Sequence, residues 1–323
     1  MESAIKPQPK VSVIMPAYMT AHLIAGALDS VLQQTYRDYE IVVVNDGSPD
    51  TAELERVLAP YQGKIVYIKQ QNKRAAGARN SGIRQSQGEF LAFLDSDDTW
   101  SPDHLALQMK LFEQDPALDL VYCNGLLETP AGSREFMDIC PSRGPATFEA
   151  LVIERCQISV STVVARKRAL EKAGFFDESL ARCDDYDMWL RAAFWGAKIG
   201  YSDNVQARFS GNRPGALSGS SLKMNEAYWK ILEKAIQTLP LSDSQKDLVQ
   251  QRAAEIRAQF MLEEGKIHLQ EGRLSEAMEL LSESNARLQR PKLSLVLLGL
   301  KIAPGTTRKL FAFGKKMRNG AVS

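Results

Sequence analysis

The chain has few cysteines, no long apolar run and almost no excess of charge. Its four cysteines show none of the pair spacings typical of zinc or redox sites, so reduced thiols in a cytoplasm are expected. No uninterrupted apolar run approaches the roughly 20 residues that a membrane span requires, so no integral membrane segment is expected. Forty basic residues against 39 acidic ones leave a net charge of +1, which argues against general nucleic-acid binding.

Two further absences narrow the classes of protein. The segment Met1–Lys10 is polar, contains two prolines and lacks the apolar core of a signal peptide. The sequence has no Gly-x-Gly-x-x-Gly and no phosphate loop ending in Gly-Lys-Ser, so neither a dinucleotide nor a triphosphate cradle is indicated. With 323 residues, 44% of them apolar and 24% charged, the composition is that of a globular protein with one large domain and a smaller one.

Strand and helix signals alternate in the first third of the chain. Apolar runs predict buried strands over 11–15, 40–44, 64–69, 90–95 and 119–123, with helices over about 21–34 and 76–86. This alternation predicts a parallel sheet with helices on both faces and right-handed crossovers. Residues 129–147, rich in Pro, Gly and Ser, are expected to form a loop that shapes a pocket. An apolar stretch over 158–165 follows, then helices over about 168–173 and 184–195.

From Leu222 onward the sequence indicates helices alone. Residues 255–269 and 274–288 have a helical pattern, and Gly265, Gly272 and Ala277 fall roughly where a tetratricopeptide-type hairpin places small residues. Because one such unit cannot bury its faces without neighbours, a helical cap packed on the catalytic domain is the favoured interpretation.

The end of the chain is apolar and then basic. Leu293–Leu300 is nearly all apolar, and no acidic residue occurs after Glu283. An apolar patch followed by clustered cations is typical of a membrane-surface anchor. A last core helix followed by a disordered basic end fits the same pattern, so both interpretations stay open. The basic residues of this tail are Lys301, Arg308, Lys309, Lys315, Lys316 and Arg318.

An acidic cluster follows the apolar run 90–94. Asp95, Asp97 and Asp98 place three carboxylates within four positions, at the carboxyl end of a predicted buried strand, where open α/β sheets bind ligands. Like charges packed together are costly without a cation, and hard oxygen ligands suit Mg²⁺ or Mn²⁺, which carry substrate phosphates. From this stretch alone, a solvated acidic turn is an equal alternative.

Two other polar groups follow predicted strands and should lie at the same edge of the sheet. These are Pro16-Ala17-Tyr18 and Asn45-Asp46-Gly47-Ser48. Tyr18 can stack on a planar base, and Asp46 can accept a hydrogen bond from a base N–H. Taken singly, each is better explained as a strand end or a turn. Their joint placement favours a ligand site.

Six blocks, in this order, resemble the motifs of family 2 glycosyltransferases with the GT-A fold. They are Val11–Tyr18, Val43–Ser48, Ala78–Gly82, Asp95–Asp98, Gly174–Glu178 and Asp184–Arg191. The resemblance covers about residues 10–220 and implies an α/β fold, a Rossmann-like and mostly parallel central sheet flanked by helices. It implies an N-terminal tail over 1–9, a GT-A domain over 10–220, and an all-helical extension with a basic tail over 221–323.

The resemblance also implies an activity. It implies an inverting hexosyl-type transfer from a nucleoside-diphosphate sugar, foremost a UDP-sugar, to a hydroxyl of a glycan or lipid-linked acceptor in bacterial polysaccharide synthesis. The expected location is the cytoplasm, including the inner face of the cytoplasmic membrane. Mn²⁺ or Mg²⁺ would be bound by Asp97 with support from Asp95. The donor site implied comprises Pro16, Ala17, Tyr18, Asp46, Arg74, Arg79, Asp95, Asp98 and Arg213.

The implied general base is Asp185, the second acidic residue of a pair that opens a helix. A helix N-terminus is expected to lower the pKa of Asp185 and keep it ionised. Without the resemblance, Asp184, Asp185 and Asp187 would be interpreted as helix-capping acids. One departure from the family pattern is Asn45, where many members have a second Asp, so Asp46 is left as the sole acidic partner for the base.

Two alternatives belong to other classes. A sugar nucleotidyltransferase would need a glycine-rich, basic signature near the first strand, which Met15–Met19 lacks. An inactive nucleotide-sugar-binding scaffold is disfavoured because Asp46, Asp97 and Asp185 are all intact.

Overall fold

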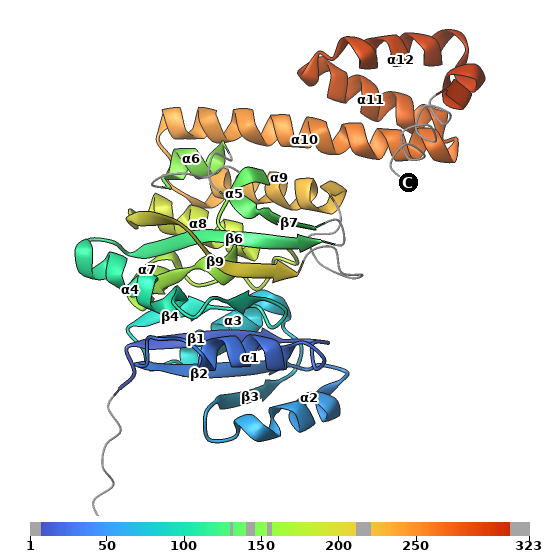
Figure 1. The fold of residues 1–323 in the computed structure, drawn as a ribbon. Coiled ribbons are helices and arrows are strands. Elements are labelled where there is room, and N and C mark those ends of the chain that lie inside the picture. The colour runs from blue at the N-terminus through green and yellow to red at the C-terminus, as the bar shows by residue number, and fades with distance from the viewer. Residues whose placement is uncertain (1–7, 130–131, 140–145, 154–156, 211–220, 311–323) are drawn as a thin grey trace, which may run out of the picture. The chain divides into compact units, whose positions relative to one another are not determined.

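The chain divides into two compact units, Met1–Ala216 and Leu217–Ser323. The structure, a computed structural model, describes residues 8–129, 132–139, 146–153, 157–210 and 221–310 (Figure 1). Within these residues, every helix is too short or too polar to cross a lipid bilayer.

The first unit is built on a mixed sheet with the strand order β3-β2-β1-β4-β8-β6-β9-β5, and β7 pairs with β6 at its margin. β1, β2, β3 and β4 run parallel, as predicted, whereas β8 is antiparallel to both β4 and β6. The strands are β1 (Val11–Ala17), β2 (Tyr39–Asp46), β3 (Val66–Gln70), β4 (Phe90–Phe93), β5 (Thr99–Trp100), β6 (Leu120–Thr129), β7 (Gly132–Glu135), β8 (Val164–Arg166) and β9 (Ile199–Ser210).

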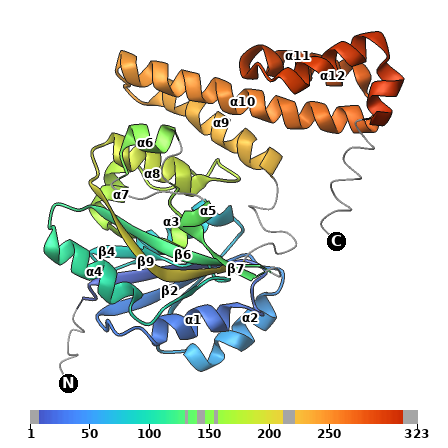
Figure 2. The same cartoon turned by 45° about the horizontal axis from the view of Figure 1, so that its top comes forward.

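Helices cover both faces of the parallel part of this sheet (Figure 2). Because side chains alternate along a strand, Val13 and Met15 of β1 pack with Leu28 of α1, whereas Ile14 points to α3 on the opposite face. The helices of this unit are α1 (Ile24–Leu32), α2 (Thr51–Leu58), α3 (Arg74–Gln85), α4 (His104–Gln114), α5 (Phe136–Ile139), α6 (Phe148–Val152), α7 (Lys167–Ala173) and α8 (Asp184–Phe194), with short 3₁₀ turns over Ala59–Tyr61 and Val160–Thr162.

The segment 129–147 differs from the predicted loop. Where the structure describes it, β7 and α5 occupy it, and β6 continues six residues beyond the predicted strand end at position 123, to Thr129. Long-range pairing explains this difference, because β6 hydrogen-bonds β9 along most of its length and β7 closes a hairpin onto it. Polar composition alone cannot reveal such partners.

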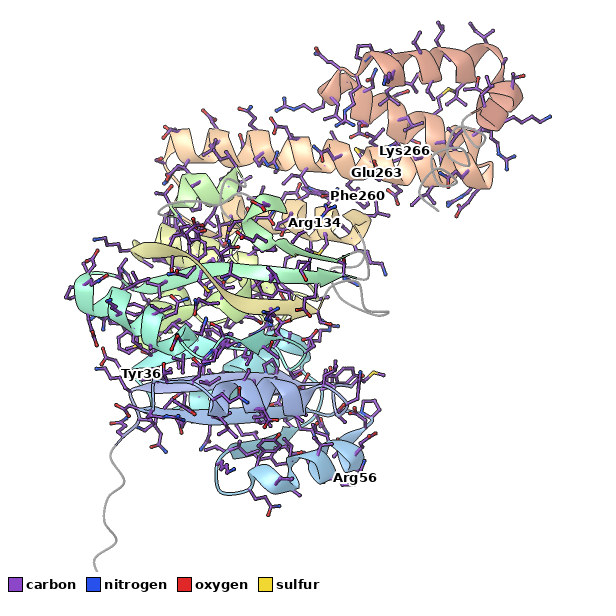
Figure 3. The ribbon with its side chains drawn as sticks, viewed as in Figure 1. Tyr36, Arg56, Arg134, Phe260, Glu263 and Lys266 are labelled. Atoms are coloured by element: carbon purple, nitrogen blue, oxygen red, sulfur yellow. The ribbon has the colours of Figure 1, made fainter. Side chains whose placement is uncertain are left out.

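The second unit is helical, comprising α9 (Ser221–Thr238), α10 (Asp243–Glu271), α11 (Leu274–Leu288) and α12 (Pro291–Ile302). α11 has the predicted bounds, whereas α10 is longer than predicted because a capping box of Ser242 and Gln245 starts it early. Phe260 packs on Trp229 of α9 with ring centroids 5.8 Å apart. On α10, the partly buried Lys266 and Glu263 form an ion pair, with Nζ 2.6 Å from Oε1 (Figure 3).

Gly82 lets α3 lie close against side chains of the sheet. A Cβ at this position would lie 2.5 Å from Cγ2 of the buried Ile14, so only glycine fits without movement. Gly26 of α1 offers a matched contrast, because a Cβ there would meet nothing within 4 Å.

We therefore expect Gly82→Ala and Gly26→Ala to change stability in opposite directions. Overpacking at Gly82 should lower the free energy of unfolding by about 1–3 kcal/mol. Gly26→Ala should raise it by roughly 0.5–1 kcal/mol, because alanine suits a helix better than glycine. Equilibrium urea unfolding of both variants and the wild type checks this pair, and equal effects of the two substitutions would contradict the close approach of α3.

Candidate active site

The carboxyl ends of β1, β2 and β4 lie side by side at one edge of the sheet. Ala17 pairs with Asn45, and Ile14 pairs with Phe93, so the segments that follow these strands emerge together. Ala17 is buried, Pro16 is partly buried and the Tyr18 ring is exposed. An exposed aromatic ring at a strand end has the position needed to stack on a flat ligand.

Asp46 is the last residue of β2 and precedes a tight turn. Its side chain is buried, and Oδ1 accepts hydrogen bonds from Gln70 Nε2 at 2.7 Å and from the backbone N of Lys73 at 2.8 Å. The next residue, Gly47, has a φ of +64°, and a Cβ there would be 2.7 Å from the backbone N of Asn72. Glycine is thus required for the 70–73 segment to approach the Asp46 carboxylate.

Asn45 has a structural task that an aspartate could not perform. Its amide nitrogen donates to Thr51 Oγ1 at 3.0 Å and to the Tyr67 hydroxyl at 2.8 Å, and its oxygen accepts from the backbone N of Ser48 at 3.0 Å. A carboxylate has no donor to offer these partners. The predicted departure from the family pattern therefore coincides with a fully hydrogen-bonded amide that holds the turn.

The acidic cluster is present at the end of β4. One carboxylate oxygen from each of Asp95, Asp97 and Asp98 lies within 4.8 Å of the others. Asp98 is buried, and its two oxygens accept from Ser161 Oγ at 2.6 Å and from the backbone N of Ser210 at 3.3 Å. Burial first, and then the charges of Asp97 and Asp95, raise the pKa of Asp98. Such a group of hard oxygens at close range fits Mg²⁺ or Mn²⁺.

Arg79 of α3 joins this cluster to the start of α8. Its side chain is 5% exposed, and the guanidinium is 2.8 Å from Asp95 Oδ1 and 2.6 Å from Asp184 Oδ2. Burial alone would lower the pKa of Arg79, but the carboxylates of Asp95, Asp184 and Asp185 outweigh it and raise that pKa. One buried cation therefore connects two acidic groups that are far apart in the sequence.

The three acids in the first turn of α8 have different partners. Asp184 binds Arg79, and Asp187 forms an ion pair with Arg191, Nη2 to Oδ2, at 2.7 Å. Asp185 is only partly exposed, and its Oδ1 accepts a hydrogen bond from the backbone N of Tyr186 at 2.8 Å. The N-cap residue is Cys183, which has a φ of +56° and whose side chain makes no capping hydrogen bond. The acids are therefore not a simple capping set.

The expected lowering of the Asp185 pKa is wrong. Burial, followed by the charge of Asp184, raises the pKa of Asp185 to about 6, although the charge of Arg79 and the Tyr186 N–H act in the opposite direction. The helix N-terminus is thus outweighed by poor solvation and by a neighbouring carboxylate. A carboxylate of this pKa is ionised at neutral pH and still basic enough to accept a proton.

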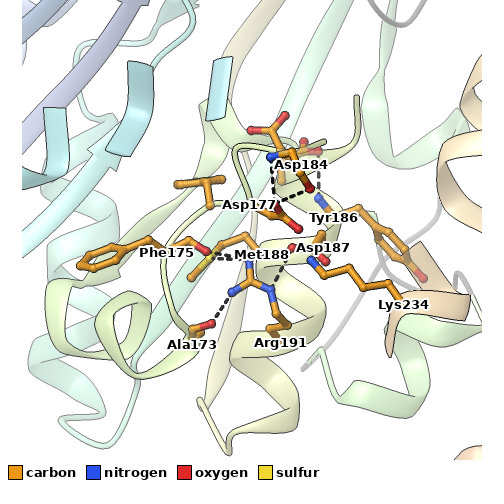
Figure 4. A network of polar contacts seen from close by, with 12 residues as sticks. Ala173, Phe175, Asp177, Asp184, Tyr186, Asp187, Met188, Arg191 and Lys234 are labelled. Carbon is orange, nitrogen blue, oxygen red and sulfur yellow. Dashed lines mark hydrogen bonds and ion pairs between the residues drawn. The ribbon is translucent and has the colours of Figure 1, made fainter. Parts of the chain in front are cut away.

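Arg191 fixes the loop that precedes α8. It donates from Nη2 to the carbonyl of Phe175 at 2.6 Å, from Nη1 to the carbonyl of Ala173, and from Nε to Asp187 Oδ2 at 2.8 Å (Figure 4). Phe175 has a φ of +62°, a strained value for a bulky residue that these bonds help to hold.

Asn80 holds the same loop from the side of α3. Its Nδ2 donates to the carbonyl of Phe176 at 2.8 Å and to Glu178 Oε1 at 3.0 Å, and its Oδ1 accepts from the backbone N of Phe176 at 3.0 Å. Asn80, Ser161 and Arg191 were not among the predicted site residues. Asn80 and Arg191 lie inside the resembling blocks, whereas Ser161 lies in an apolar stretch with no signal of its own.

Two predicted donor-site residues remain, Arg74 and Arg213. Arg74 is exposed at the start of α3 with a φ of +62°. Arg213 lies outside the described residues. Of the four cysteines, Cys123 and Cys183 are buried thiols, and Cys140 and Cys156 also lie outside the described residues.

Comparison with known proteins gives the family. The sequence profile described as Glycosyl transferase family 2 matches residues 12–140. A UDP-Glc:alpha-D-GlcNAc-diphosphoundecaprenol beta-1,3-glucosyltransferase of Escherichia coli is 32% identical over 182 residues, which cover 56% of this chain and 68% of that protein. The chain belongs to glycosyl transferase family 2. This confirms the resemblance and the predicted enzyme class, a glycosyltransferase.

Other relatives are longer than the matched region. A Rickettsia conorii protein named as an uncharacterized glycosyltransferase is 31% identical over 199 residues, which cover 60% of this chain but 33% of that protein. The chain thus matches about a third of the length of this relative.

Solved structures share the fold. Staphylococcus aureus TarS 1–349 in complex with UDP-GlcNAc has a TM-score of 0.63 at 18% identity, covering 87% of this chain and 92% of that one. A Pyrobaculum calidifontis mannosyltransferase in complex with GDP-Man and Mn²⁺ has a TM-score of 0.61 at 21% identity, covering 98% and 87%. These likenesses confirm the predicted GT-A fold class.

We expect Arg79→Met to be strongly destabilising, because it leaves Asp95 and Asp184 without their shared buried cation. The loss should be about 3–5 kcal/mol, as for other broken buried ion pairs. Arg84→Met, on the same helix and exposed, is the matched control and should stay within about 0.5 kcal/mol of the wild type. Urea unfolding of both variants measures the difference, and similar midpoints for the two would contradict the role given to Arg79.

Proposed function

We propose that this protein is an inverting glycosyltransferase that moves a sugar from a nucleoside-diphosphate sugar to an acceptor hydroxyl, with Asp185 as the general base. The observation that carries the proposal is the pair of ionic contacts of Arg79, 2.8 Å to Asp95 and 2.6 Å to Asp184. Through these contacts one guanidinium joins Asp95, a member of the proposed metal-binding cluster, to Asp184, the neighbour of the proposed base Asp185.

The proposed proton transfer uses Asp185. In an inverting transfer the acceptor hydroxyl attacks the anomeric carbon from the face opposite the leaving diphosphate. A carboxylate within hydrogen-bond reach of that hydroxyl accepts its proton as the new bond forms. The Asp185 pKa of about 6 supports this assignment, because the group is ionised at pH 7 and remains a useful base. Asp184 is held by Arg79 and is less suited to the task.

The proposed donor site lies along the strand ends. Tyr18 would stack on the base, Asp46 would accept a hydrogen bond from it, and Pro16 and Ala17 would line the ribose. Arg74 and Arg213 are proposed as further donor contacts. Asp98 is proposed to face the donor sugar, since each of its oxygens accepts one hydrogen bond from the protein and keeps a second lone pair.

A divalent cation is proposed at the acidic cluster. Asp97 and Asp95 would hold Mn²⁺ or Mg²⁺, which when bound would neutralise negative charge on the departing diphosphate. The close carboxylate oxygens support this proposal, as does the Mn²⁺ in the complex of the Pyrobaculum mannosyltransferase. Arg79, whose Nη2 is 2.8 Å from Asp95 Oδ1, is proposed to orient that carboxylate.

The finer substrate assignment rests on relatives. We propose a UDP-sugar donor and a lipid-linked glycan acceptor, at the cytoplasmic face of a bacterial membrane. The name of the E. coli relative, with its UDP-Glc donor and diphosphoundecaprenol acceptor, supports this choice. The UDP-GlcNAc complex of TarS supports the same donor class.

We expect Asp185→Asn to lower the rate of sugar transfer by about 10²–10⁴-fold, the usual contribution of a general base. Binding of UDP should persist, because the side chain keeps its size and lies outside the proposed base and ribose site. Transfer assays and UDP-induced thermal stabilisation measure the two effects separately. Asp203→Asn, an exposed aspartate of β9, is the matched control.

The pH profile provides a second readout of Asp185. Wild-type kcat/KM should fall as the pH drops below about 6, because the protonated carboxyl cannot accept a proton, and should level off above that pH. The residual activity of Asp185→Asn should lack this acid limb. Equal activity of wild type and variant, or an unchanged acid limb, would contradict the base assignment.

Removal of divalent metal should stop turnover. We expect EDTA to abolish transfer and added Mn²⁺ or Mg²⁺ to restore it, because the leaving diphosphate needs a countercharge. Asp97→Asn should remain inactive at metal concentrations that restore Asp203→Asn. Donor turnover in EDTA-treated samples, before and after metal addition, measures this effect. Undiminished activity without divalent metal would remove the role given to Asp97.

A further inference from the structure

Exposed large apolar side chains gather near the end of the second unit. Leu295, Leu298 and Ile302 of α12 are 70%, 54% and 75% exposed, and Leu310 beyond the helix is 67% exposed. We call Leu295, Leu298 and Ile302 the α12 stripe. Burying such side chains is favourable, so a contiguous stripe in solvent indicates a contact surface.

The stripe is one face of a helix whose other face is already packed. Leu293 and Leu300 are buried in a cluster with Leu262 of α10 and Leu281 of α11. At about 100° per residue, the mean direction of the stripe lies roughly opposite to Leu293 and Leu300. The residues of the α12 stripe are therefore not part of the core of this unit. One apolar face of α12 packs in that core, and the other, the stripe, is exposed.

Exposed cations flank the stripe. On the same helical projection, Lys292 and Lys301 lie about 90° to either side of it. Arg290 and Lys309 are also exposed near the two ends of the segment, and the sequence has no acidic residue after Glu283. An apolar stripe with a lysine on each side is typical of a helix that lies in a lipid–water interface, with its ammonium groups at the level of the headgroups.

We propose that the α12 stripe and its flanking cations bind the surface of an anionic lipid bilayer, with α12 lying in the plane of the interface. A second copy of the chain is a poorer occupant, because both copies would bring exposed lysines to the contact and no acidic residue after Glu283 is available to offset them. A membrane span is excluded for α12 by its length, since its 12 residues extend about 18 Å. The inference stands on the helix itself, although it agrees with the lipid-linked acceptor proposed above.

The test is co-sedimentation of the full chain with vesicles of phosphatidylcholine alone or of phosphatidylcholine mixed with phosphatidylglycerol. We expect binding to the anionic vesicles, weaker binding to the neutral ones, and loss of binding as salt is added. Replacing Leu295, Leu298 and Ile302 together by Ser should weaken binding at least about tenfold. Lys292→Gln and Lys301→Gln should each weaken it about fivefold.

Matched controls come from other exposed positions. Ile267→Ser on α10 and Lys110→Gln on α4 remove one apolar and one cationic exposed side chain elsewhere and should leave vesicle binding unchanged. Unaltered thermal unfolding shows that the stripe variant is folded. Its donor hydrolysis without vesicles separates this inference from the proposed catalytic site, because no stripe residue belongs to that site.

Two results would overturn the inference. One is absence of binding to anionic vesicles, or equal binding by the wild type and the stripe variant. The other is a wild-type dimer in analytical ultracentrifugation that the stripe substitutions dissociate, without vesicle binding, which would assign the stripe to a second copy of the chain.

Discussion

The buried guanidinium of Arg79 is the interaction on which the proposed site depends. A cation removed from water is stable only when anions surround it closely, and here Asp95 and Asp184 do so from two different elements. The same requirement acts in reverse on the carboxylates, which need a cation at this spacing. The ion pairs of Arg79 with Asp95 and Asp184, rather than the shape of a loop, therefore set the distance between the end of β4 and the start of α8.

Around this ion pair, residues of the resembling blocks divide into those that can meet a ligand and those that hold the blocks together. Asn80 and Arg191 hydrogen-bond the loop 174–178 from α3 and from α8. Asn45 holds the turn that presents Asp46. Sequence motifs of this kind therefore contain residues that hold the fold as well as residues that can meet a ligand, and a residue within a motif need not touch substrate.

The elements that could be predicted are those set by local patterns. Apolar runs located β1, β2 and β4, and helical periodicity gave the bounds of α11. The antiparallel β8 and the extension of β6 could not be predicted, because strand direction depends on partners far away in the chain. The expected lowering of the Asp185 pKa was wrong for a similar reason. The helix terminus is visible in the sequence, whereas burial and the orientation of Asp184 are products of packing. Ser161, which links the Asp95 backbone to the Asp98 carboxylate, has no sequence signal at all.

Gly82 has a consequence beyond stability. Because Gly82 has no side chain, α3 approaches the sheet as closely as the Ile14 side chain allows. Arg79 lies three residues earlier, almost one helical turn away on a similar face. The distance between the Arg79 guanidinium and the strand ends therefore depends on the missing side chain at Gly82. Gly82 has no group that could take part in chemistry, yet it determines where the positive charge of the site is located.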